Sequence, residues 1–408
     1  MSTEFVPAAE VRPVTFAVRA SDHRERGRRR GAELRTGIAS TLAAYRRYFA
    51  HLNIAEAAVR TAATSSLERL QAWSPTAAEE IAAVAEGAGI EVAELMEIIS
   101  RTEIMTQAAA APTECSTVSY TRPGASVAAQ NWDWAADFSS LWHINDVGAV
   151  PGQRRHAGIA EFGMLGKIGL NESGVGVLLN ILKHTADGPG GVPVHAILDR
   201  VLSEADTLAE ALEIIHSAPT SSSSIITVIT AEAAVQIEIA GDRKRERRVG
   251  SDGNGGVAAD RGDLAVGDSG FLIHTNHFLH PDLLDGALEL RPDSTSQARY
   301  RHLAEAVARF ETARLEVRDS GAGPTGTSSA AAAERADTAQ PVTVGDLTTL
   351  LTTEPGEAPV CCTPDPGATY GNRSATLVSV RIDPARKQID LAPGSPIEGL
   401  HGNRSFQL

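Results

Sequence analysis

The chain has 408 residues and carries 37 Lys and Arg against 51 Asp and Glu, a formal net charge of −14. This length allows one large domain or two average ones, and either buries a substantial core. The acidic balance argues against nucleic acid or an anionic membrane as an obligatory partner. Three cysteines are too few for a disulfide framework, so a reducing, cytoplasmic setting is expected.

Segments that would direct the chain to a membrane are not expected. The first residues lack a basic region followed by an apolar core, and no apolar window approaches the ~20 residues that cross a bilayer. The adjacent Cys361 and Cys362 are read as ordinary thiols, since vicinal disulfides are strained. Without a Cys-x-x-Cys motif, a cysteine zinc site is not predicted. We expect a soluble, unexported protein without a metal.

Residues 21–111 are mostly helical in pattern. Ser21 and Asp22 can cap a helix that runs to His51, because polar side chains there accept from the first free backbone amides. The arginine-rich run at 24–30 is expected to be a solvated face of that helix rather than a phosphate site. Two further helices are predicted at 75–87 and 92–105.

From Cys115 onward the pattern alternates as in strands. The later elements predicted in chain order are a hairpin at 167–170 and 175–180, a helical stretch at 192–217, a hairpin at 225–230 and 234–240, an exposed connection at 242–263, helices at 296–317 and 344–352, and strands at 375–382 and 388–392. Residues 321–340 are of low complexity and are predicted to be a flexible surface insertion.

This order of elements predicts an α+β fold, a four-layer αββα sandwich of stacked antiparallel sheets between helical layers. It divides the chain into a helical region, 1–114, and a mainly β region, 115–408. We find no glycine-rich dinucleotide fingerprint after a strand and no phosphate-binding Walker loop. Nucleotide chemistry is therefore not predicted.

Cys115 opens a short polar strand at the junction between these regions. A lone strand cysteine is most often a small buried hydrophobe. Here a turn at 122–124 leads to a second strand that contains Asn131, Trp132, Asp133 and Trp134, which would place a carboxylate beside the thiol. If Cys115 became a chain terminus, its α-amine, with pKa ~8, would match the thiol's pKa of ~8.5 and could act as its base.

This hairpin resembles the start of the catalytic subunit of cysteine N-terminal-nucleophile hydrolases, in particular the isopenicillin-N acyltransferase (acyl-coenzyme A:6-aminopenicillanic acid acyltransferase) family. Further motifs resemble the same family in order and spacing, over about residues 20–400. They are the arginine-rich run at 24–31, Gly87-Ala88-Gly89, the Gly-x-x-Gly-x-Asn-x-x-Gly hairpin at 166–174 leading to Asn180, the helix start Gly191–His195, His274–Phe278, and Ser296–Leu303.

The resemblance implies self-cleavage between Glu114 and Cys115, after which Cys115 is the nucleophile and its amine the base. It implies that Asp133 orients this amine and that Asn276 stabilises the oxyanion, where an amide donor can be worth roughly 3 kcal/mol. Arg299 would lie near the nucleophile, although Ser296 capping a helix with Arg299 in solvent is a competing interpretation. Candidate pocket residues are Asn131, Trp132, Trp134, Asn180 and Ser296.

The expected activity is acyl transfer or amide hydrolysis through an acyl-enzyme. The expected partners are a small acyl donor, with acyl-coenzyme A a candidate substrate, an amine acceptor, and the chain's own cleaved N-terminal fragment; no cofactor is expected. Two departures stand out, since relatives often carry glycine where Glu114 precedes the nucleophile, and His302 replaces a usual second arginine. The first bears on the rate of self-cleavage, because glycine eases the strained N→S acyl shift.

Two alternatives stay open. One is a conventional thiol hydrolase without self-cleavage, in which His274 or His277 is the base for Cys115. These histidines form His-x-x-His, but in a strand-like setting rather than the helical one of zinc proteases, so no metal is predicted. The other is a degenerate, non-catalytic binding protein.

Overall fold

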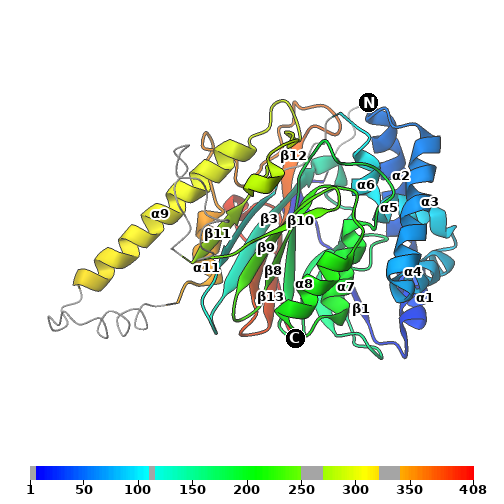
Figure 1. Cartoon of the computed structure of the whole chain (residues 1–408), viewed down its shortest axis with the longest axis horizontal. Helices are drawn as coiled ribbons and strands as arrows, with labels where there is room; N and C mark the ends of the chain where they lie inside the picture. Colours follow the sequence, from blue (N-terminus) through cyan, green and yellow to red (C-terminus); the bar gives the residue numbers. More distant parts are fainter. Residues whose placement is uncertain (1–5, 110–114, 250–269, 321–340) are drawn as a thin grey trace.

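Two β-sheets lie face to face between layers of helices in the computed structural model (Figure 1). The structure describes residues 6–109, 115–249, 270–320 and 341–408. Apolar side chains from both sheets share one buried core. The eight-stranded sheet has the order β1 (Thr15–Val18), β4 (Trp142–Val147), β5 (His156–Glu161), β6 (Ile168–Asn171), β7 (Gly176–Ile181), β8 (Ser224–Ile229), β9 (Ala234–Ala240), β10 (Arg243–Arg247).

The second sheet carries the strand that follows Cys115. Its six strands have the order β11 (Phe271–His274), β2 (Ser116–Tyr120), β3 (Val127–Ala135), β12 (Ser374–Asp383), β13 (Gln388–Pro393), β14 (Arg404–Gln407), all antiparallel. The predicted hairpin is confirmed, with Ser116 opposite Asn131. Continuing that register by one residue places Cys115 beside Trp132.

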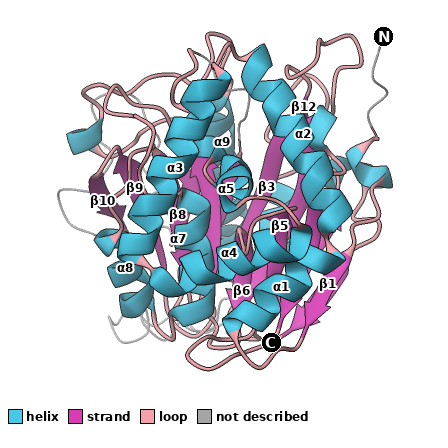
Figure 2. Ribbon diagram, turned by 90° about the vertical axis from the view of Figure 1, so that its right-hand side faces the viewer, coloured by secondary structure: helices cyan, strands magenta, loops and turns pink. Residues whose placement is uncertain are grey.

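Helices cover both outer faces, which confirms the predicted α+β sandwich. Figure 2 shows the N-terminal helices in front of the strands. On the side of the eight-stranded sheet lie α1 (His23–Glu33), α2 (Arg35–His51), α3 (Glu56–Trp73), α4 (Pro75–Ala88), α5 (Val92–Ile99), α6 (Arg101–Met105), α7 (Val194–Glu204) and α8 (Leu208–Ser217). On the six-stranded sheet lie α9 (Ser296–Ser320) and α11 (Val344–Leu350).

The helix expected to run to His51 breaks at Leu34 into α1 and α2. Its predicted start is confirmed, because the Asp22 carboxylate accepts from the Glu25 amide at 2.8 Å. Glycines let α1 cross α4 at close range. A Cβ on Gly31 would lie 2.0 Å from the Val84 carbonyl oxygen, so no larger residue fits there without moving a helix.

The expectation that the arginine-rich run faces solvent is wrong for two of its members. Arg26 and Arg30 are buried. Arg26 forms an ion pair with Glu80 at 2.6 Å, and Arg30 donates to the Asn145 side chain at 2.9 Å. Buried guanidinium groups persist only with such partners. The partners come from segments distant in the sequence, which local pattern does not reveal.

One strand pair departs from the predicted antiparallel arrangement. β1 pairs in parallel with β4, with Thr15 opposite Ile144. A strand from the N-terminal region therefore belongs to the sheet built by the rest of the chain. The helical stretch at 192–217 also divides in two, because Thr207 and Glu210 form a capping box that begins α8.

Glu114, the insertion at 321–340 and residues 250–263 of the predicted exposed connection lie outside the described residues. The prediction of a connection is wrong for 243–247, which form β10 and pair with β9. Among the helices that the structure does describe, none is long and apolar enough to span a bilayer. The hairpins at β6–β7 and β8–β9 and the strands β12 and β13 lie where the sequence predicts them.

Candidate active site

The backbone of Cys115 is held at both of its polar ends. Its N–H donates to Asn276 Oδ1 at 2.7 Å. Its carbonyl oxygen accepts from Arg299 Nη1 at 2.8 Å and from Asn180 Nδ2 at 3.0 Å. Four predicted site residues therefore meet at one point, although they are up to 184 positions apart. They come from the position just before β2, from β7, from the turn after β11 and from α9.

Arg299 links these groups. Its Nη2 donates to Asn276 Oδ1 at 2.9 Å, and its Nη1 also donates to Ser116 Oγ at 2.9 Å. Arg299 is fully buried, so the competing interpretation of a solvent-facing arginine on α9 is wrong. Because a guanidinium holds its donors in one plane, it fixes Cys115 and Asn276 relative to each other.

The Cys115 thiol is buried, with Sγ 3.9 Å from the main-chain oxygen of Asp133. Burial raises the pKa of the thiol to about 12, and the nearby charge of Asp133 also raises it. Lys167 and Arg299 act in the opposite direction on this pKa. In the uncleaved chain Cys115 is therefore a protonated thiol near neutral pH.

Asp133 is held by the neighbouring strand. Thr376, its partner across β3 and β12, donates its hydroxyl to Asp133 Oδ1 at 2.5 Å. Thr376 Oγ1 in turn accepts from the Cys362 amide at 2.8 Å. The ladder shifts register between Thr376 and Val378, so this threonine sits at an irregular point of the sheet. No local sequence pattern indicates the contact of Thr376 with Asp133, because the two residues are 243 positions apart.

Asn276 is placed by a network at the start of α9. Its backbone N–H donates to Ser296 Oγ at 2.7 Å, and its Nδ2 donates to the Ile181 carbonyl at 2.9 Å. Ser296, predicted as a pocket residue, thus holds the backbone of Asn276. Asn276 Oδ1, an acceptor, faces the Cys115 nitrogen.

The two histidines of the His-x-x-His motif have other partners. His274 Nε2 lies 3.0 Å from Glu238 Oε1, and His277 Nδ1 lies 2.7 Å from Ser296 Oγ. Burial lowers the pKa of His277 to about 3, and the His274 charge lowers it too. Over the described ranges, no group of three or more His, Cys, Asp or Glu side chains is arranged to hold a metal ion.

The remaining predicted residues separate into two groups. Trp132 and Trp134 lie in the core between the sheets, under cations: Lys167 Nζ is 3.4 Å from the Trp132 ring centroid, and the Arg101 guanidinium carbon is 4.3 Å from that of Trp134. Asn131 does not join the Cys115 cluster. Its Nδ2 donates to the Leu351 carbonyl at 2.8 Å, on the α11 side of the sheet.

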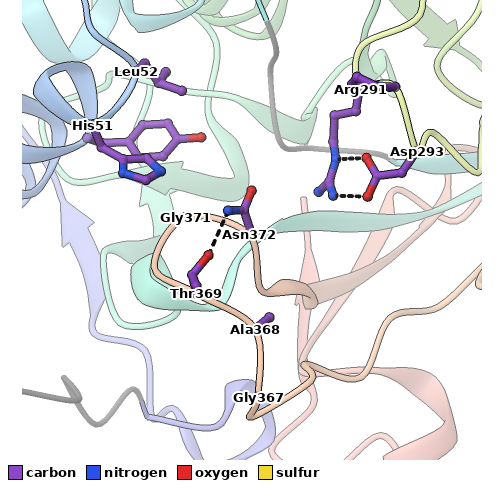
Figure 3. A pocket seen from close by; sticks show the side chains of 11 residues that line it. His51, Leu52, Arg291, Asp293, Gly367, Ala368, Thr369, Gly371 and Asn372 are labelled. Atoms are coloured by element: carbon purple, nitrogen blue, oxygen red, sulfur yellow. Dashed lines mark hydrogen bonds and ion pairs between the residues drawn. The ribbon is translucent and has the colours of Figure 1, made fainter.

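A cavity of about 570 Å³ lies between the end of α2 and two loops, 291–293 and 367–372 (Figure 3). His51, Thr369, Asn372, and the paired Arg291 and Asp293 line it, whereas Cys115 does not. A smaller cavity of about 30 Å³ is lined by Ile181, whose carbonyl accepts from Asn276, together with Thr102, Met105, Lys183 and Ser222 among others. Neither lining was predicted, because segments distant in the sequence form both.

A sequence model of the acyl-coenzyme A:6-aminopenicillanic acid acyl-transferase family matches residues 120–328, just over half of the chain. This range includes Asp133, Asn180, Asn276 and Arg299 and begins shortly after Cys115.

A relative from Emericella nidulans, the 40 kDa form of acyl-coenzyme A:6-aminopenicillanic-acid-acyltransferase, is 29% identical over 245 residues. The alignment covers 59% of this chain and 62% of that relative, so the chain spans less than two thirds of its length. Among solved structures, penicillin V acylase from Agrobacterium tumefaciens aligns over 68% of this chain and 83% of its own, with 13% identity and a TM-score of 0.33. That likeness is too slight to bear on the site.

Proposed function

Because the chain belongs to the acyl-coenzyme A:6-aminopenicillanic acid acyl-transferase family, we propose that it is a self-cleaving enzyme that transfers or hydrolyses acyl groups through Cys115. The observation that carries this proposal is the contact between the Cys115 nitrogen and Asn276 Oδ1 at 2.7 Å. A nitrogen that becomes a catalytic amine must be held in a fixed direction relative to its own thiol, and this contact supplies that restraint.

Self-cleavage would convert the backbone nitrogen of Cys115 into that amine. The thiol attacks the Glu114 carbonyl carbon, a C–S bond forms, the C–N bond breaks, and the thiol proton ends on the departing nitrogen. Water then hydrolyses the thioester, which leaves a carboxyl group on Glu114 and restores the thiol. Arg299 and Asn180, which bind the Cys115 carbonyl, would hold the residue still during both steps.

In the cleaved enzyme the α-amine takes the thiol proton and the thiolate attacks the acyl donor. The leaving group departs with that proton, as an amine or a thiol, and an amine or water then takes the acyl group from sulfur. Asp133, held by Thr376, would favour the protonated amine by its charge.

The observed contacts of Asn276 favour a different role from the one expected. The family resemblance implies that Asn276 stabilises the oxyanion, a role that needs a hydrogen-bond donor. Its oxygen instead accepts from the Cys115 nitrogen and from Arg299, and its Nδ2 donates to Ile181. We therefore assign Asn276 to the positioning of the amine.

The substrate classes follow from family membership and from the name of the Emericella nidulans relative. We propose an acyl-coenzyme A thioester or an amide as donor, and an amine or water as acceptor. No other cofactor is proposed. The cytoplasm stays the proposed setting, because reducing conditions keep the nucleophilic thiol available.

N-terminal sequencing of the purified protein tests this function. We expect a fragment that begins at Cys115, and we expect Cys115→Ala to remain one chain, because the thiol itself attacks the bond. Variants Cys361→Ala and Cys362→Ala should still cleave. Splitting of Cys115→Ala at the same bond would assign the cut to a foreign protease. An intact wild-type chain with acyl-transfer activity would support the thiol hydrolase without self-cleavage.

A further inference from the structure

A buried charge cluster lies beside the proposed nucleophile, and the mechanism above does not use it. Glu161 on β5 is its centre. Lys167 Nζ donates to Glu161 Oε2 at 2.9 Å, Arg101 Nη2 donates to the same oxygen at 2.8 Å, and the Tyr45 hydroxyl donates to Oε1. All four residues are buried, with Lys167 only 2% exposed. Burying such groups is costly, so a cluster of this kind calls for a reason.

The cluster reaches Cys115 through Trp132. The Lys167 ammonium stands over the Trp132 ring, 3.4 Å from its centroid, at cation–π distance. Because Ser116 pairs with Asn131, the next position along the strand sets Cys115 beside Trp132. The indole therefore lies next to both the ammonium and the nucleophile's residue. The Lys167 charge lowers the pKa of the thiol against the larger effect of burial.

Lys167 decides the net charge of this cluster. Burial alone would lower the pKa of Arg101, but the charge of Glu161 raises it, so Arg101 stays protonated. Burial alone would raise the pKa of Glu161, but the charges of Arg101 and Lys167 have the larger effect and hold that pKa low. The positive charge of Arg101 and the negative charge of Glu161 thus cancel. Burial lowers the pKa of Lys167 to about 7, Glu161 opposes this fall, and Arg101 adds to it. The cluster therefore carries one positive charge below about pH 7 and none well above it.

Three other titratable groups face the cluster. Glu103 on α6 lies near Arg101, and burial raises its pKa to about 7, so it changes charge in the same range. His195 on α7 stays neutral, because burial and the charges of Arg101 and Lys167 hold its pKa well below its ordinary value. Tyr45 on α2 stays protonated, because burial raises its pKa. On the far side of Cys115, Asp133 and Arg299 act on the thiol with opposite signs. Lys167 acts directly on the thiol and changes charge near neutral pH, whereas Glu103 acts on the cluster through Arg101.

We propose that Lys167 is a positioning residue for the Cys115 nucleophile: its ammonium, held over Trp132 by Glu161, stabilises the Cys115 thiolate. This rests on the proposed function in one respect, that Cys115 is the nucleophile. A lysine fits the task because its compact ammonium can sit over one ring while it bonds to one carboxylate. Lys167 lies in the glycine-rich hairpin at 166–174, at a variable position of its motif.

The rate of Cys115 alkylation by iodoacetamide, followed between pH 6 and 9 by peptide mass spectrometry, tests this without any substrate. The variants are Lys167→Met and Lys167→Arg, with Lys244→Met as control, since Lys244 is also shielded from solvent and paired with a carboxylate, that of Asp242. We expect Lys167→Met to slow alkylation about tenfold near neutral pH. Lys167→Arg should be alkylated at least as fast as wild type. It should also keep its advantage over Lys167→Met at higher pH, because arginine stays charged. Lys244→Met should match wild type.

The outcomes separate this inference from the proposed function. Alkylation in Lys167→Met at the wild-type rate overturns the role of Lys167 and leaves Cys115 as nucleophile. If Cys115 is alkylated as slowly in Lys167→Arg as in Lys167→Met, the role of Lys167 is also overturned. The positive charge would then not determine the reactivity of the thiol. Failure of Cys115 to react in any folded variant removes the nucleophile itself, and the proposed function with it.

A measurement on the unmutated chain covers the case in which Lys167 variants do not fold. Cys115 is converted either to its carboxymethyl form, which is negative, or to its carbamidomethyl form, which is neutral, and the lysine titrations are followed by NMR. Coupling between two sites is reciprocal. We therefore expect a higher pKa for Lys167 beside the negative adduct and unchanged titration of Lys244. Equal titration of Lys167 in both forms overturns the inference.

Discussion

The side chain of Asn276 shows how one residue can fix a nucleophile that must also act as its own base. Its oxygen binds the Cys115 nitrogen and Arg299, while Ser296 holds its backbone. An amide is suited to this position, because its oxygen accepts hydrogen bonds without bringing a negative charge that would disfavour the thiolate.

Replacement of Asn276 by alanine should lower kcat by roughly 10²-fold with little change in KM, because the amine would lose its fixed direction. Steady-state kinetics of the cleaved enzyme measure this, and Asn403→Ala, an exposed asparagine, is the control. A change confined to KM would place Asn276 in substrate binding instead, and unchanged kinetics would remove it from the site.

At the scale of elements, β12 carries two hydroxyl side chains that bind different residues of β3. Thr376 bonds to Asp133 of the site, whereas Ser379 donates to Asn131 Oδ1 at 2.7 Å, whose Nδ2 binds the Leu351 carbonyl. The first contact orients a charge beside the nucleophile. The second ties the sheet to the α11 layer.

Thr376→Val should therefore reduce kcat about tenfold and unfold at a lower temperature, because a hydrogen bond to a charged group is worth about 1.5–3 kcal/mol. Ser379→Ala, its matched control on the same strand, should cost about 1 kcal/mol of stability and leave kcat unchanged. Kinetics together with thermal unfolding distinguish the two roles. Equal kinetic losses in both variants would mean that the strand, rather than the Asp133 contact, matters.

At the scale of the whole molecule, the features that sequence predicts are those encoded locally. Asp22 caps α1, and the β6–β7 hairpin forms around its turn, because backbone rules act over a few residues. The gathering of Cys115, Asn276 and Arg299 was expected only through a family resemblance.

What could not be predicted depends on contacts across the fold. Arg30 donates a hydrogen bond to Asn145, and β1 pairs with β4. Lys167 and Arg101 both donate to Glu161. Each partner lies in a segment whose position is set by packing of the whole chain. The arginine-rich run at 24–30 was therefore expected to face solvent, although Arg26 and Arg30 are buried.

These same contacts tie residues 6–109 to the rest of the chain. β1 is hydrogen bonded within the main sheet, Arg101 and Tyr45 bind Glu161 in the core, and Glu103 Oε1 accepts from the Val194 amide at 3.0 Å. Cleavage before Cys115 would remove a covalent link but leave this buried interface intact.

We therefore expect the two fragments to elute together in size-exclusion chromatography and to part only in denaturant. Arg101→Met should weaken their association by about 3–5 kcal/mol, since it leaves the buried Glu161 without one of its cations. Arg46→Met is the control, because Arg46 pairs with Glu94 and Glu97 inside the N-terminal region. The pKa of Glu161 is held below its ordinary 4.5, so its contribution is complete above about that pH and declines as the pH falls further. Fragments that separate spontaneously at neutral pH, or an Arg46→Met effect as large as that of Arg101→Met, would contradict an interface anchored at Glu161.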